Sequence, residues 1–245
     1  MNQEMDEIER LQKELEQSPE WDRLWSVREF HSTVEIFRAN AAEVMRFLRE
    51  SEQADTNESV FEVEAFRSLQ QELARLVHNF AAAAFTLVEH ARAFFGAKYG
   101  TSSLFAAYDA EVERRFRKNP LHNFLQGLRN YVVHQRFPAM TTMRSWSQGG
   151  RITHLHFWQR IDLLKSDRWN ATAKLFLEQS IEQIYVKHVV FDYEKLVNEF
   201  YEWVFDRLKK FHASDEEVVA HRQRQIDLIV QHLATQAAAL QTPRK

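Results

Sequence analysis

The sequence predicts a mainly α-helical protein that folds as an antiparallel helical bundle and carries one β-hairpin. Only five Gly and four Pro occur among its 245 residues, so long helices can run with few breaks. Apolar residues recur at helical spacing along most of the chain, and 44% of all residues are hydrophobic, which is enough for a packed core. The pattern changes to the alternation of a hairpin only in the segment 138–161.

Breaks in the periodicity place the helix boundaries. Pro19 and Pro120 suit the first position of a helix, and Pro138 must follow the end of one because it forces the preceding residue out of the α region. The hairpin is expected to turn at Gly149-Gly150. The predicted helices cover residues 3–17, 20–49, 60–97, 102–118, 120–135, 170–179, 192–211 and 215–239.

These elements suggest four parts of the chain. The polar stretch 51–59 marks the end of an N-terminal helical extension. A helical core that contains the helix 120–135 would follow, then the inserted hairpin, and then C-terminal helices that complete the bundle. The predicted parts are therefore 1–57, 58–137, 138–161 and 162–245.

Composition excludes several classes of function. The absence of Cys removes disulfides, thiolate nucleophiles and Cys-based zinc sites. The acidic N-terminus differs from a secretion signal, and no stretch approaches the roughly 18 apolar residues of a membrane helix. No Walker motif or other glycine-rich phosphate loop occurs. We expect a soluble cytoplasmic protein without membrane contact and without a bound cofactor.

A basic segment is concealed by the near-neutral composition. Residues 114–161 contain no Asp or Glu and nine Arg or Lys, which leaves 23 basic and 35 acidic residues in the rest of the chain. Such a segment favours contact with an RNA backbone, and aromatic side chains within it could stack on bases. The alternative is a solvated helix end that follows Glu111 and Glu113. The predicted RNA-binding residues are Arg114, Arg115, Arg117, Lys118, Arg136 and Tyr131, with Phe116, Trp146 and Trp158 as further stacking positions.

Within this segment, Arg129, Asn130 and His134 combine three useful side chains on one apolar helix. A His can move a proton, an Arg can hold a phosphate, and an amide can orient either group. At about 100° per residue, Asn130 and His134 share one face, whereas Arg129 lies about 140° from His134. One helix therefore makes a cramped site, and two helices related by a two-fold axis would pool two copies of each residue.

The pattern Arg129-Asn130-x-x-x-His134 resembles the R-x(4–6)-H signature of the HEPN superfamily. The resemblance implies a helical bundle of HEPN type that forms a homodimer through the helix 120–135. It also implies a metal-independent endoribonuclease, acting as a toxin or antiviral defence effector, with RNA as its substrate and an antitoxin or regulator as a further partner. In this interpretation His134 deprotonates the ribose 2′-OH or protonates the 5′-oxygen leaving group, Arg129 grips the scissile phosphate, and Asn130 orients His134 or binds a phosphate oxygen.

Two alternatives stay open. Arg129, Asn130 and His134 lie near a helix C-terminus, where they could simply cap backbone carbonyls and pair across the bundle. The chain could also be a non-catalytic HEPN-like dimer that serves as an RNA-binding or protein-interaction module, with Arg129 and His134 only sealing the dimer.

The same spacing between an Arg and a His also occurs where no such site is expected. These other pairs span the Asn119-Pro120 break, lie in the predicted hairpin, or lie at a helix end. These competing pairs are Arg115/His122, Arg117/His122, Arg151/His156 and Arg207/His212.

His154 and His156 share one face of a predicted strand, where they could contact a metal. No third ligand is evident in the sequence, and a polar strand face explains both residues equally well. No metal site is therefore predicted.

Overall fold

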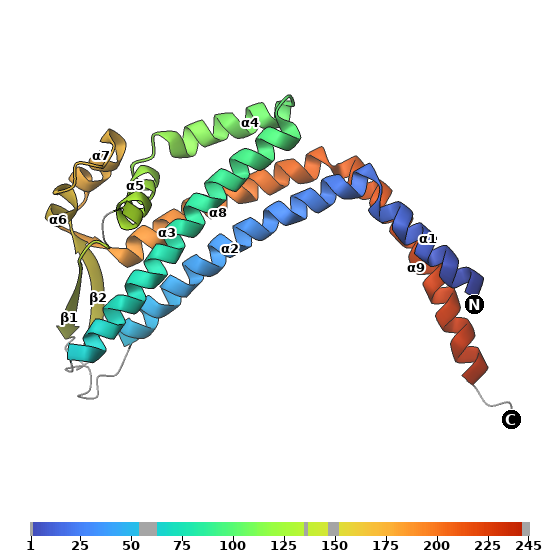
Figure 1. The fold of residues 1–245 in the computed structure, drawn as a ribbon, viewed down its shortest axis with the longest axis horizontal. Coiled ribbons are helices and arrows are strands. Elements are labelled where there is room, and N and C mark those ends of the chain that lie inside the picture. Colours follow the sequence, from blue (N-terminus) through green and yellow to red (C-terminus); the bar gives the residue numbers. More distant parts are fainter. Residues whose placement is uncertain (1, 54–62, 135–136, 147–151, 242–245) are drawn as a thin grey trace. The chain divides into compact units, whose positions relative to one another are not determined.

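The computed structural model describes residues 2–53, 63–134, 137–146 and 152–241 of the chain. It is mostly helical, as predicted (Figure 1). The helices, in chain order, are α1 (Asn2–Glu16), α2 (Pro19–Gln53), α3 (Val63–Tyr99), α4 (Ser103–Val112), the π-helical turn η2 (Glu113–Arg117), α5 (Pro120–His134), α6 (Arg160–Leu164), α7 (Ala171–Gln179), α8 (Val186–Phe211) and α9 (Ala213–Gln241).

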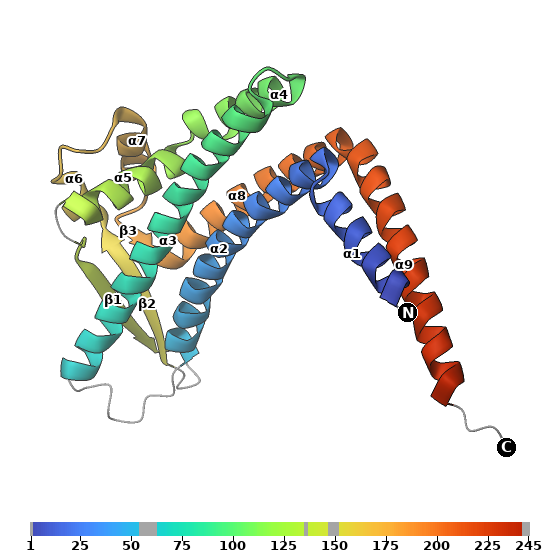
Figure 2. The same cartoon turned by 45° about the vertical axis from the view of Figure 1, so that its right-hand side comes forward.

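The predicted hairpin is confirmed as part of a three-stranded antiparallel sheet (Figure 2). Strand β1 (Met140–Trp146) pairs with β2 (Ile152–Gln159), and β2 pairs with β3 (Gln183–Tyr185). The expected turn at Gly149-Gly150 lies outside the described residues. Neither β3 nor the short helix α6 was predicted, because three to five residues are too few to show a period.

The chain divides into two compact units, whose boundaries fall inside α2 and α8. The first unit comprises residues 1–31 and 205–245, and the second comprises residues 32–204. The predicted boundary near residue 57 lies in the segment 54–62, outside the described residues. The four-part organisation of the sequence stays a prediction.

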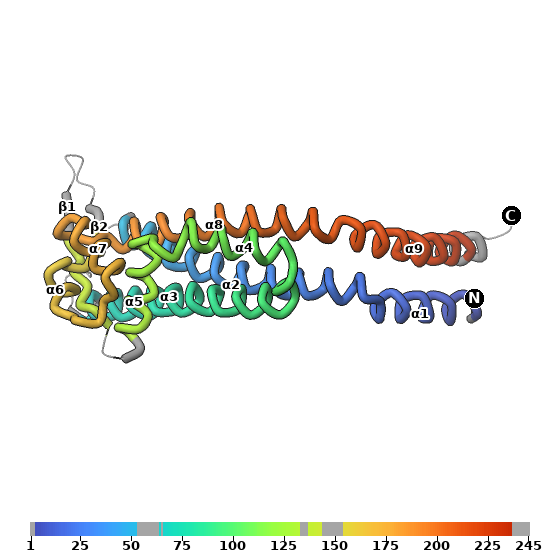
Figure 3. The backbone as a smooth tube through the Cα atoms, turned by 90° about the horizontal axis from the view of Figure 1, so that it is seen from above, coloured from blue at the N-terminus to red at the C-terminus, as the bar shows by residue number. Residues whose placement is uncertain are grey.

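In the first unit, α1 runs alongside α9 (Figure 3). Their shared core consists of Ile8, Leu15 and Ile226, which are all buried. A helix of 15 residues is marginal alone in water, so this packing supplies most of its stability. The partly buried side chains around this core are Leu11, Trp21, Val219, Ile229 and Leu233.

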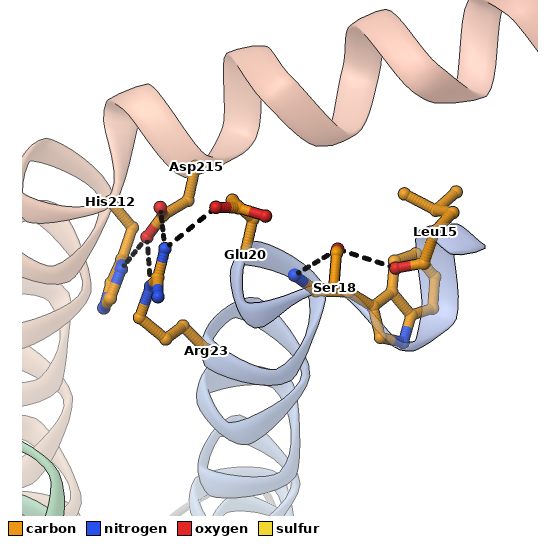
Figure 4. A network of polar contacts seen from close by, with 7 residues as sticks. Leu15, Ser18, Glu20, Arg23, His212 and Asp215 are labelled. Atoms are coloured by element: carbon orange, nitrogen blue, oxygen red, sulfur yellow. Dashed lines mark hydrogen bonds and ion pairs between the residues drawn. The ribbon is translucent and has the colours of Figure 1, made fainter. Parts of the chain in front are cut away.

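A polar network within the first unit joins the start of α2 to the start of α9 (Figure 4). Arg23 donates two hydrogen bonds to the Asp215 carboxylate, at 2.6 and 3.0 Å, and Nδ1 of His212 lies 2.7 Å from the same carboxylate. His212 is 2% exposed, so it is enclosed by this network. The hydrogen bonds from Arg23, with a smaller contribution from His212, lower the pKa of Asp215 to about 2.

At the break between α1 and α2, Ser18 satisfies backbone groups of both helices. Its hydroxyl donates to the Leu15 carbonyl at 2.7 Å and accepts from the Trp21 amide at 3.3 Å (Figure 4). Ser18 therefore acts as the cap of α2, where Pro19 occupies the first helical position as predicted.

In the second unit, a core rich in aromatic rings lies between α2, α3, α4, α5 and α8. Tyr108 of α4 stacks on Phe95 of α3 at 3.9 Å between ring centroids. Tyr193 of α8 meets Phe37 and Phe80 edge to face. The largest fully buried rings of this unit are Phe37, Phe80, Phe95, Phe124, Trp158, Tyr193 and Phe200.

Trp169 fixes the position of α5 by packing onto its backbone. A Cβ atom at Gly127 would lie 2.6 Å from Cε3 of the Trp169 ring, so only glycine admits this approach. The ring also stacks on Tyr131, with 4° between planes, and on Phe124, with 27° between planes. Its indole N–H donates to the Leu163 carbonyl at 2.7 Å, which holds the ring in place.

We expect Gly127→Ala to lower the free energy of unfolding by about 1–3 kcal/mol, because the methyl group overpacks against a ring that cannot move. Gly96→Ala is the matched control, since a Cβ atom there meets nothing within 4 Å. Removing a helical glycine at that open position should stabilise by roughly 0.5–1 kcal/mol. Urea denaturation measures both effects, and equal stabilities of the two variants would contradict the assignment.

We expect Asp215→Asn to lower the free energy of unfolding at pH 7 by about 1–3 kcal/mol, because it removes the charge-assisted bonds from Arg23 and His212. The pKa of Asp215 is about 2 in the folded protein, below its ordinary value of 3.8. Its contribution is therefore complete above pH 3.8 and is lost as the pH falls toward 2. The difference between wild type and variant in urea titrations should shrink over that window. Asp227→Asn on the exposed surface of α9 is the control and should change little.

Candidate functional site

Arg129 lies half-buried on α5, in contact with two neutral groups. Its guanidinium carbon is 4.3 Å from the centroid of the Phe85 ring on α3, and its Nη1 donates to the side-chain oxygen of Asn130 at 3.1 Å. No carboxylate of the described residues forms an ion pair with it. The cation–π contact and the hydrogen bond to the Asn130 side chain position the guanidinium without neutralising its charge.

The rotation of α5 sets which residues are accessible. Arg129 lies about 160° around the helix from Tyr131, which faces Trp169, and Asn130 lies between them in an exposed position. His134 is the last residue of α5, one turn beyond Asn130. Its side chain lies outside the described residues, as does the whole of Arg136, so the predicted Arg–His geometry stays a prediction.

The basic run before α5 is neutralised by carboxylates that precede it in the chain. Arg114 and Arg115 both donate to Glu111, and Arg117 forms an ion pair with Glu113 at 2.6 Å. The hydrogen bonds from Arg114 and Arg115 lower the pKa of Glu111 to about 2. The arginines that open the acid-free segment are therefore paired with acids that stand just before it.

Two further contacts extend this pairing. Arg115 also lies 3.7 Å from Glu199 of α8, so its guanidinium is shared between two helices. Lys118, directly after η2, is exposed. The predicted contact of these residues with RNA stays a prediction, and their ion pairs favour the alternative of a solvated helix end.

Three aromatic residues of the basic segment belong to the core. Phe116, Tyr131 and Trp158 are 8%, 7% and 1% exposed, which speaks against stacking of RNA bases on their rings. The Tyr131 ring instead stacks on Trp169. The side chain of Trp146 lies outside the described residues.

His122, which shares the spacing with Arg115 and Arg117, is enclosed in the second unit. Its Nδ1 lies 3.1 Å from the Tyr193 hydroxyl oxygen, and its ring contacts Phe116 edge to face. Burial lowers its pKa to about 4, so the imidazole is neutral at physiological pH. No catalytic pairing with either arginine is indicated.

His154 and His156 hold the end of α2 against β2. Nδ1 of His154 donates to the Ser51 carbonyl at 2.8 Å, and Nε2 of His156 lies 3.0 Å from the Ser51 hydroxyl. That hydroxyl already donates its proton to the Leu48 carbonyl, so Nε2–H of His156 must donate to Ser51. Nδ1 of His156 then accepts from Thr142 at 2.9 Å. The two histidines share a face, as predicted, but this face is buried and hydrogen-bonded.

This Ser–His contact is not an activated nucleophile. The Ser51 proton points to a backbone carbonyl, Ser51 is buried, and burial lowers the pKa of His156 to about 4. Across the described part of the chain, no three His, Asp or Glu side chains lie close enough together to hold a metal ion.

The contact between Arg129 and Phe85 could not be predicted from the sequence. Phe85 fits the apolar stripe of α3 and so looks like an ordinary core residue. Nothing in the local pattern connects it with a residue 44 positions later, and only the packing of α3 against α5 brings the two together.

Comparison of the chain with protein-family models, with curated proteins and with solved structures finds no match. Among the described helices, none has the length and apolar character needed to cross a membrane. The proposed function therefore rests on the local chemistry of the residues around α5.

We expect the free energy of unfolding to fall as the pH falls from about 6.5 to about 4. In this window the unfolded chain takes up protons at His122 and His156, whereas the folded protein does not, because both pKa values are lowered to about 4. His122→Gln should reduce this fall by on the order of 1–3 kcal/mol, since one of the titrating groups is gone.

Urea titrations between pH 7 and pH 4 measure the effect. His221→Gln, on the exposed surface of α9, is the control and should leave the pH dependence unchanged. An unchanged pH dependence in His122→Gln would show that the pKa of His122 is the same in the folded and the unfolded protein, and would contradict this account.

Proposed function

We propose that the protein is a metal-independent endoribonuclease of the HEPN type that acts through Arg129, Asn130 and His134. One observation carries the proposal: the charge of Arg129 is supported by a ring and an amide, whereas Arg114 and Arg117 are already paired with carboxylates. A half-buried guanidinium without a carboxylate partner retains its full attraction for a phosphate group.

The proposed reaction uses the ribose of the substrate as the nucleophile. The 2′-oxygen forms a bond to phosphorus while the bond between phosphorus and the 5′-oxygen breaks. One imidazole accepts the 2′-OH proton, and the 5′-oxygen receives a proton as it leaves. The products are a 2′,3′-cyclic phosphate and a 5′-OH, and the balance needs no metal or other co-reactant.

Each of the three residues has a separate task in this reaction. His134 moves the proton, and Arg129 binds the scissile phosphate and stabilises the charge of the transition state. Asn130 accepts a hydrogen bond from Arg129 through its side-chain oxygen, which restrains the guanidinium. Its amide N–H groups could then donate to a phosphate oxygen. The contact with Phe85 lowers the freedom of Arg129 before substrate arrives.

A homodimer through α5 completes this proposal, because one α5 helix supplies only one imidazole at the motif. A symmetric pair of helices would supply one His to accept a proton and a second to donate one. The role as a toxin or antiviral defence effector, with an antitoxin or regulatory partner, follows from the resemblance of the motif.

The second candidate is a non-catalytic helical module on the same chain. The ion pairs of Arg114, Arg115 and Arg117 favour it, because they leave less unneutralised charge for an RNA backbone. In that case Arg129 and His134 would serve contacts between protein chains.

We expect the purified protein to cleave total RNA in the presence of EDTA. Loss of the imidazole in His134→Ala should reduce the cleavage rate by about 10²–10⁴-fold. Loss of the guanidinium in Arg129→Ala should reduce it by about 10²–10³-fold. Gel electrophoresis of timed samples measures both rates.

His221→Ala and Arg67→Ala are the matched controls, because both positions are exposed and distant in sequence from α5. Both should cleave at the rate of wild type. Equal rates for His134→Ala and His221→Ala would exclude His134 as the proton-transfer group. A wild type that leaves RNA intact would favour the non-catalytic module.

A further inference from the structure

A cavity of about 290 Å³ lies at the π-helical turn η2 in the second unit. Its walls come from four successive elements, α3, α4, η2 and α5, and none of the three proposed catalytic residues lines it. π-Helical turns are rare, and they occur preferentially at functional sites. The lining residues are Val88, Arg92, Phe105, Tyr108, Asp109, Val112, Phe116, Arg117, His122 and Asn123.

The charged side chains at this cavity are paired to different degrees. Arg92 and Arg117 line it together with the single carboxylate of Asp109. The Arg92 side chain is 74% exposed and contacts Glu89 only at 3.5 Å, so its guanidinium is free to turn toward an incoming ligand. Arg117 is paired with Glu113 at 2.6 Å and lies 3.9 Å from Asp109, which leaves Arg92 as the less tightly paired cation of the wall.

The polar groups of the interior are donors. Tyr108 is buried, which raises its pKa to about 12 against the opposing charge of the neighbouring Arg92, so its hydroxyl stays protonated. Burial raises the pKa of Tyr193, so its hydroxyl stays protonated and donates to Nδ1 of His122 across 3.1 Å. Because His122 is neutral, its remaining proton sits on Nε2 as a donor.

The remaining walls of the cavity are apolar. Val88, Val112 and the rings of Phe105 and Phe116 face the space. A second, smaller cavity of about 50 Å³ adjoins it and shares Val88, Tyr108, Val112, Phe116 and His122. Ligand pockets usually span roughly 300–1,000 Å³, so this one suits a ligand of one or two rings.

We propose that the cavity between α3, α4, η2 and α5 binds a small planar aromatic ring that carries an anionic group. The apolar walls would cover the ring, and Arg92 and the Tyr108 hydroxyl would bind the anionic group. Nε2–H of His122 would donate to an acceptor on the edge of the ring. Nucleoside monophosphates and aromatic carboxylic acids both provide this chemistry.

The site is separate from the proposed catalytic residues. His122 and Arg129 lie on one side of α5, but seven residues apart, which corresponds to about 10.5 Å along the helix. Ligand binding here does not depend on RNA cleavage, and loss of one activity leaves the other intact.

Isothermal titration calorimetry tests the proposal with the full chain. The probes are adenosine and uridine 5′-monophosphate, indole-3-acetate, 4-hydroxybenzoate and inorganic phosphate. We expect at least one ring-bearing anion to bind with a Kd at least tenfold lower than that of inorganic phosphate. Binding of nucleotides or of aromatic acids identifies which source of this chemistry the cavity accepts.

Three variants locate the binding. Arg92→Ala should raise the Kd at least tenfold, and Val88→Phe, which fills both cavities, should abolish binding. Arg67→Ala, an exposed arginine of α3 remote from the cavity, is the control and should bind like wild type. Circular dichroism shows whether Val88→Phe folds, and Arg92→Ala decides the test if it does not.

Two results would overturn the proposal. One is a wild type that binds none of the ring-bearing anions, or binds them no better than phosphate. The other is a Kd for Arg92→Ala equal to that of Arg67→Ala.

Discussion

The packing of Trp169 against the bare backbone at Gly127 is the contact on which the arrangement around α5 depends. It lets an indole ring lie directly on the helix between Phe124 and Tyr131, and the bond to the Leu163 carbonyl holds that ring from the other side. One face of α5 is thereby committed to the core. The opposite face must then meet α3, where Arg129 covers Phe85. The rotation of α5, which leaves Asn130 exposed, therefore depends on Gly127, a residue with no proposed role in catalysis.

Charge pairing separates the arginines of the basic segment into two groups. Arg114, Arg115 and Arg117 pair with carboxylates from the preceding turn, and the pairs of the exposed Arg114 and Arg117 contribute little to stability. Arg129 is held by the Phe85 ring and the Asn130 amide, and no carboxylate of the described residues forms an ion pair with it. Arg23 shows the third possibility, because Asp215 and His212 complete a network whose role is to join two helices. The pairing of an arginine in this protein thus depends on the neighbours that the fold supplies.

Much of the helical framework could be predicted because Gly and Pro are scarce and fall at its boundaries: α2 and α5 begin at Pro19 and Pro120 as expected. The hairpin followed from alternation, whereas β3 is too short to show any. The candidate site was less predictable. Glu111 and Glu113, just before the acid-free segment, suggested the alternative of a solvated helix end, but only the structure shows that they pair with Arg114 and Arg117. The sequence also could not distinguish an aromatic ring that stacks on a base from one that fills the core. Burial in the structure assigns Phe116, Tyr131 and Trp158 to the core.

The central claim is that Arg129 and His134 cleave RNA with the 2′-OH of the substrate as the nucleophile. A short oligoribonucleotide that is cut at one mapped position, compared with the same oligonucleotide carrying a single 2′-deoxy nucleotide on the 5′ side of that position, tests it directly. Mass spectrometry of the products in EDTA should show a 2′,3′-cyclic phosphate from the all-ribose substrate and no cleavage at the deoxy position. Cleavage of the deoxy substrate at the same position and rate would contradict the account.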